Sequence, residues 1–128
     1  MLWNKNLETG VPAIDIQHKE LFHQIDILSD NNNKDRFPQT VKFLGDYVKK
    51  HFADEQALHA KANYPKAEQH KKMHVEFAAA FEKMRKEYEA DSLNLTILHK
   101  ITKTVFDWLK THIMVHDKEF AVFYTSKK

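Results

Sequence analysis

Apolar side chains recur every three or four residues through four long segments of this 128-residue chain. That spacing places them along one face of an α-helix and does not fit a β-strand, in which side chains alternate with a period of two. Only two glycines and three prolines occur. So few turn-forming residues suit long helices and are too few for a β-rich fold. We therefore predict an all-α fold. The helical segments cover residues 13–29, 37–62, 65–90 and 92–115, followed by a short helical tail at 118–124.

Short polar or proline-containing stretches separate these segments. They lie at residues 10–12, 29–35, 63–65 and 91–92. At the last of them, either Asp91 or Ser92 would cap the helix that follows. Amphipathic helices joined by short loops pack as an antiparallel, up-down-up-down four-helix bundle. We predict one domain over residues 1–128, with an N-terminal arm and a short C-terminal helix.

Composition excludes several classes of function. The absence of cysteine excludes disulfides, thiolate metal sites, iron–sulfur clusters held by four cysteines and a cysteine nucleophile. The formal net charge of +2 gives no electrostatic reason to expect a nucleic-acid or anionic membrane partner. No apolar run approaches the roughly 20 residues that span a bilayer, and the N-terminus lacks a signal-peptide pattern. We therefore expect a cytoplasmic location.

The predicted core faces contain polar residues where apolar ones are normal. Nine histidines are many for a chain of this length, and each of the four helical faces includes at least one of them. The second face also includes Glu55. An unpaired polar group is costly to bury, and in a bundle these side chains converge toward the axis. A hydrogen-bonded core histidine would explain one such position, whereas four faces together indicate a metal site.

Two pairs of residues have a spacing that suits a shared metal ion. His51 and Glu55 lie four residues apart, as do His70 and His74, so each pair lies one above the other on one helix face. Imidazole and carboxylate without thiolate suit iron, manganese, zinc or copper.

The fourth segment leaves two arrangements open. His112 lies on the core face, and His116, four residues further on, would share that face in a straight helix. Asp117, five residues on, is rotated by roughly 140° from His112 at 3.6 residues per turn. It points inward only if the helix loosens or turns there, and it otherwise caps the tail helix.

Together these residues resemble the hemerythrin family in its bacterial single-domain form, over nearly the whole chain. The resemblance runs through Trp3, residues 10–21, His51-Phe-Ala-Asp-Glu55, Tyr64-Pro65, His70-x-x-x-His74, Trp108-x-x-x-His112-Ile113 and Asp117. It implies a non-heme pair of iron ions, bridged by an oxo or hydroxo group, that binds dioxygen reversibly for transport, storage, delivery or sensing.

The resemblance also implies a ligand set. One iron would be bound by His70, His74 and His112, the other by His18 and His51, with Glu55 and Asp117 bridging the two. The bridging role favours Asp117 over His116. One iron would keep a position for dioxygen, lined by an apolar pocket that excludes water. Candidate pocket residues, each of which would equally serve as plain core packing, are Ile14, Phe22, Phe52, Leu109 and Ile113.

His59 departs from the family pattern, which commonly has methionine at this position. Four roles are open to it: approaching the open iron, donating a hydrogen bond to bound peroxide, binding iron as an extra ligand, or simply facing solvent or the loop. If His59 reaches the iron, a di-iron enzyme acting on peroxide, dioxygen or nitric oxide becomes the alternative function. We expect an oxygen-binding protein rather than an enzyme, with dioxygen as its partner and a monomer or weak homo-oligomer as its state.

Overall fold

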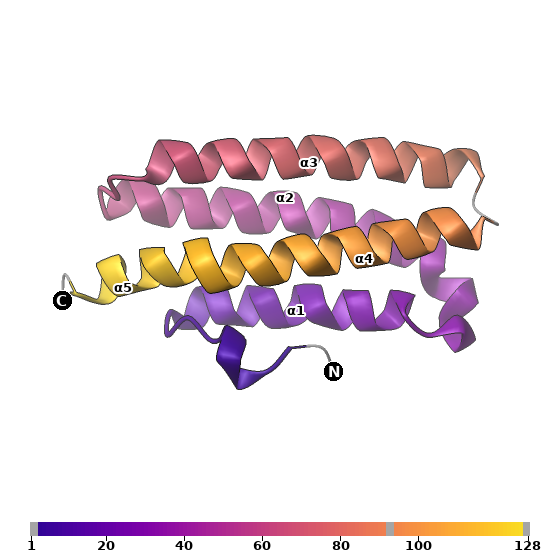
Figure 1. Ribbon diagram of the computed structural model, residues 1–128, viewed down its shortest axis with the longest axis horizontal. Helices are drawn as coiled ribbons and strands as arrows, with labels where there is room; N and C mark the ends of the chain where they lie inside the picture. Colours follow the sequence, from indigo (N-terminus) through magenta and orange to yellow (C-terminus); the bar gives the residue numbers. More distant parts are fainter. Residues whose placement is uncertain (1–2, 92–93, 127–128) are drawn as a thin grey trace.

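Four long antiparallel helices form the body of the protein (Figure 1). The computed structural model describes residues 3–91 and 94–126. The long helices are α1 (Pro12–Leu28), α2 (Phe37–Lys61), α3 (Ala67–Ala90) and α4 (Leu95–His112). The short elements are η1 (Lys5–Leu7), η2 (Asn31–Arg36), η3 (Ile113–Asp117) and α5 (Lys118–Ser126). No strand occurs within the described ranges, and the predicted all-α bundle is confirmed.

Local sequence explains most helix boundaries. A proline lies in the first turn of both α1 and α2, where its missing N–H leaves no bond unmade. The fourth helix differs from the prediction at its start, because Asn94 caps α4 by accepting hydrogen bonds from the backbone N–H groups of Thr96 and Ile97. The predicted start at residue 92 and the alternative Ser92 cap lie outside the described residues. At its other end, α4 continues through η3 into α5 without a loop.

Two apolar clusters hold the helices together. The larger one runs along the bundle axis and includes Leu21, Leu44, Phe81 and Ile101. Within it, α2 and α3 approach closely at Gly45, where a Cβ atom would lie 2.8 Å from the ring of Phe81. The smaller cluster closes one end of the bundle, where α5 and the start of α1 meet the α2–α3 turn. Its buried members are Val11, Ile14, Ala62, Tyr64, Phe120 and Ala121.

None of the described helices combines the length and apolar character required to span a membrane.

Candidate metal centre

All seven residues predicted as ligands meet at one end of the bundle. The antiparallel arrangement makes this possible, because α1 and α3 contribute residues from their first halves while α2 and the α4–η3 segment contribute from their last. Each of the seven is at most 4% exposed. They form two groups, which share Glu55 and Asp117. The three-histidine group adds His70, His74 and His112, and the two-histidine group adds His18 and His51.

Glu55 turns one carboxylate oxygen toward each group. Its Oε1 lies 2.7 Å from His70 Nε2 and 3.3 Å from His74 Nε2, both in the three-histidine group. Its Oε2 lies 3.7 Å from His51 Nε2, in the two-histidine group. The carboxylate therefore stands between the two groups.

Asp117 divides its oxygens in the same way. Its Oδ1 lies 3.0 Å from His70 Nε2 and 3.2 Å from His112 Nε2. Its Oδ2 lies 3.0 Å from His18 Nε2. The two carboxylates thus face both groups from different helices.

These separations suit atoms that share a metal ion. Ligand atoms about 2.1 Å from an ion and at right angles to one another lie roughly 3 Å apart. Within the described residues, neither oxygen of Glu55 or Asp117 has an aligned hydrogen-bond donor, although ring nitrogens lie close to them. Buried carboxylate oxygens without such donors are costly, and the donor set therefore fits a cation placed among these atoms.

The inward position of Asp117 results from a change in helix type. η3 is a turn of π-helix, in which hydrogen bonds span five residues instead of four. His112 and Asp117, which are five residues apart, consequently share a face. His116 is only partly buried, and its ring centroid lies 5.3 Å from that of His112. Of the two arrangements that spacing left open, the structure has Asp117 inward, because the segment is not a straight α-helix.

Burial and mutual contact set the protonation of the metal-free site. Burial, reinforced by nearby His18, lowers the pKa of His51 to about 4. Burial also opposes a charge on His70, but Asp117 and Glu55 outweigh it and raise the pKa of His70 to about 9. The Asp117 carboxyl loses solvation as well, yet contacts from the surrounding imidazoles hold its pKa well below the usual range. A metal ion entering at neutral pH would displace the proton on His70.

Gln17 orients His51, and this role was not predicted. The Gln17 Nε2 group donates to Asp54 Oδ2 at 2.7 Å, so its Oε1 faces His51 Nδ1, also at 2.7 Å. His51 Nδ1 must then donate, which leaves the lone pair of Nε2 facing the site. The contact joins α1 to α2, and no spacing within one helix signals it.

Aromatic rings fix two further imidazoles. Phe52 stacks on His74 with ring centroids 3.9 Å apart, and Trp108 stacks on His112 at 4.3 Å. Phe52 therefore supports the three-histidine group. The five residues predicted for the oxygen pocket, Phe52 among them, are all buried, and their role toward dioxygen stays a prediction.

His59 lies inside the protein, next to the three-histidine group. It is 1% exposed, which removes the solvent-facing alternative. Its Nε2 lies 3.7 Å from Glu55 Oε1, and its ring centroid lies 4.5 Å from that of His70. Burial lowers the pKa of His59 to about 4.

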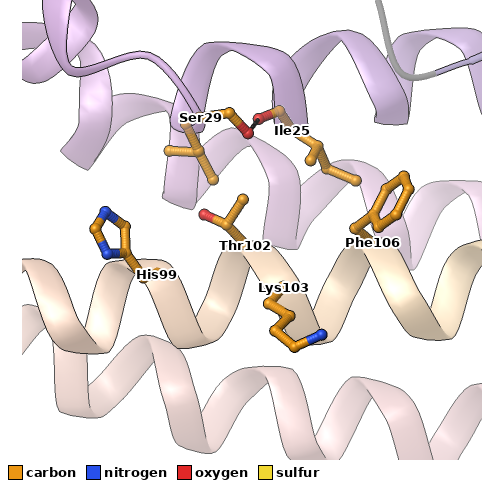
Figure 2. Close-up of a pocket in the computed structure, with 7 residues that line it drawn as sticks. Ile25, Ser29, His99, Thr102, Lys103 and Phe106 are labelled. Atoms are coloured by element: carbon orange, nitrogen blue, oxygen red, sulfur yellow. Dashed lines mark hydrogen bonds between the residues drawn. The ribbon is translucent and has the colours of Figure 1, made fainter.

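A separate hollow lies between α1 and α4, away from this site (Figure 2). Its volume is about 350 Å³, and its lining includes Ile25, His99 and Phe106. None of the seven candidate ligands lines it.

Comparisons with known proteins identify the family of this chain. The model of the family described as "Hemerythrin HHE cation binding domain" matches residues 9–123. The chain is 29% identical over 124 residues to "Bacteriohemerythrin" of Pseudomonas paraeruginosa, an alignment that covers 94% of this chain and 79% of that protein. It is 30% identical over 118 residues to "Hemerythrin subunit alpha" of Lingula anatina, covering 92% and 90% of the two chains. From the family match, these relatives and the four-helix fold, we conclude that the chain belongs to the hemerythrin family.

Proposed function

We propose that this protein binds dioxygen reversibly at a pair of iron ions held by the two histidine groups. Hemerythrins are known for non-heme iron and for binding dioxygen, and the chain belongs to that family. The observation that carries the proposal is the division of carboxylate oxygens, one to each group, in both Glu55 and Asp117. Two carboxylates placed in this way suit two neighbouring ions rather than one.

The two groups offer unequal numbers of protein donors. The three-histidine group has five donor residues and the two-histidine group has four. We therefore propose that dioxygen binds on the side of His18 and His51, where the protein supplies less of the coordination. An iron pair held by the two groups would supply the electrons that dioxygen takes up on binding and returns on release.

Apolar side chains would keep that exchange reversible. Ile14, Phe22 and Ile113 are each at most 1% exposed. Such a lining excludes water and limits the access of protons, which promote irreversible oxidation. We propose that these three residues, with Phe52 and Leu109, surround the bound gas.

The alternative of a di-iron enzyme depended on His59 approaching the open iron. His59 instead lies beside His70 and beside Glu55 Oε1, the oxygen that faces the three-histidine group. Nothing in this geometry favours the alternative over dioxygen binding.

Repeated oxygenation tests the proposal. Protein purified in air would be analysed for iron, reduced, exposed to dioxygen and then returned to argon while its visible spectrum is recorded. We expect an oxygenated spectrum that appears with dioxygen and disappears under argon over several cycles. Direct, permanent conversion to the oxidised form would contradict reversible binding.

A matched pair of variants tests the carboxylate assignment. Glu55→Gln keeps the side-chain size but leaves one oxygen donor, so it should lose the iron pair while circular dichroism still reports a helical fold. Glu76→Gln changes an exposed carboxylate on α3 and should retain the pair. An unchanged spectrum in Glu55→Gln would refute the bridging role.

A further inference from the structure

We infer that His59 is a positioning residue for Glu55, whose Oε1 accepts a hydrogen bond from His59 Nε2–H when metal is present. This inference rests on the proposed metal-binding function of the same site.

The first observation is that His59 is buried without a hydrogen-bond partner. Within the described residues, neither of its ring nitrogens has one. Its neighbours include the rings of Phe120 and Tyr64, with centroids 4.3 and 5.1 Å away. Aromatic faces and edges do not satisfy an imidazole, and an unpaired polar group of this kind destabilises the fold. An apolar residue would fill this position better if packing alone mattered.

The second observation is the position of Glu55 Oε1. It lies 3.7 Å from His59 Nε2, so a shift of about 0.5–1 Å would bring the pair to hydrogen-bond distance. A carboxylate oxygen has two lone pairs, and Oε1 can therefore face an ion and accept a hydrogen bond together. The two residues lie one turn apart on α2, which keeps the ring next to this oxygen.

A positioning role fits the geometry better than a ligand role. Five residues already have donor atoms that all lie within 4.8 Å of one another in the three-histidine group, and His59 is not among them. Hydrogen bonds to ligating residues orient them, and their loss typically weakens metal binding about 10–100-fold.

Two substitutions separate the hydrogen bond from packing. His59→Leu removes the donor and fills a similar space, whereas the side-chain amide of His59→Gln can donate from nearly the same place as Nε2. Metal-free protein would be titrated with Co²⁺ against a chromophoric chelator, and its thermal midpoint would be measured separately. We expect His59→Leu to bind Co²⁺ about 10–100-fold more weakly and His59→Gln to stay close to the unaltered protein.

The thermal stability of the metal-free protein distinguishes a positioning role of His59 from a purely structural one. His59→Leu should raise the thermal midpoint of the metal-free protein, because it replaces an unpaired polar group with an apolar one. A structural role would lower stability and Co²⁺ affinity together. If His59→Leu does not fold, His59→Met gives the same comparison.

A failure of this inference can be told apart from a failure of the proposed metal-binding function. Unchanged Co²⁺ affinity in the folded apolar variant would overturn the inference, as would an equal loss in His59→Leu and His59→Gln, which would indicate a direct ligand. If the unaltered protein binds no Co²⁺ and no iron, the proposed function itself fails.

Discussion

Burying five histidines and two carboxylates in one cluster is costly unless each side chain finds a partner. The packing of this chain holds some of them in place, although ring contacts do not replace hydrogen bonds. Aromatic rings cover His74 and His112, and Gln17 holds His51. The carboxylate oxygens stay without aligned donors within the described residues, so a cation placed among them would complete the cluster.

For single residues, we predict that Gln17→Leu weakens metal binding by the two-histidine group alone. Without Gln17, His51 loses the contact that fixes its proton on Nδ1, and the loss of such contacts typically costs about 10–100-fold in metal affinity. A stepwise Co²⁺ titration should show one weakened equivalent and one unchanged. Gln39→Leu, an exposed position on α2, is the control. If Gln17→Leu binds both Co²⁺ equivalents as tightly as the unaltered protein does, the proposed role of Gln17 is contradicted.

Sequence patterns could predict site residues that are identified by their spacing along one helix. The pairs His51 with Glu55 and His70 with His74 follow helical spacing, and all four side chains reach the site. The roles of Gln17 and His59 depend instead on contacts between elements, which no spacing within one helix encodes. Gln17 reaches His51 across 34 positions of sequence, and the burial of His59 depends in part on Phe120 of α5.

At the scale of elements, the four helices follow from the 3.6-residue period, whereas the π-turn does not. A periodic pattern assumes constant helix geometry. The π-helical turn η3 departs from that geometry at Asp117. Spacing therefore left Asp117 open, and only the family resemblance favoured it. π-turns of this kind are rare and occur frequently at functional sites.

Deleting Val115 tests whether the π-turn serves to place Asp117. Val115 is 54% exposed, and its removal would bring the Asp117 carboxylate to four residues beyond His112. A regular α-helix then turns that carboxylate inward, so the variant should still bind two metal ions per chain. Val115→Ala, which alters the side chain alone, is the control. Loss of metal in a folded deletion variant would show that the wider turn itself is required.

At the scale of the whole molecule, the site connects metal binding to stability. The N-terminal arm, the α2–α3 turn and α5 meet around the smaller apolar cluster at the end of the bundle where the site lies. A ligand that binds only the folded state stabilises it by mass action, about 2.7 kcal/mol at a free concentration 100-fold above its Kd. The metal-free protein should therefore show the titration of the buried histidines most clearly.

We predict that the metal-free protein is most stable near pH 6.5 and loses stability on both sides. The pKa of His51 falls from 6.5 to about 4 on folding, so the unfolded state binds more protons between those values. Its contribution, about 3 kcal/mol, is lost as the pH falls through that window. The pKa of His70 rises to about 9, so its contribution is present below 6.5 and is lost as the pH rises through 9.

Urea unfolding in the presence of a chelator, from pH 4 to pH 9, measures this profile. His23→Gln, at an exposed position of α1, should leave its shape unchanged. A free energy of unfolding that stays constant between pH 6.5 and pH 4.5 would contradict the assigned burial of the site.

We propose above that seven buried residues hold two iron ions close enough to share both carboxylates. Iron analysis with Mössbauer spectroscopy on protein purified in air tests it most directly. We expect two irons per chain with coupled spins and a diamagnetic ground state at low temperature. One iron per chain, zinc in place of iron, or two magnetically independent irons would contradict the claim.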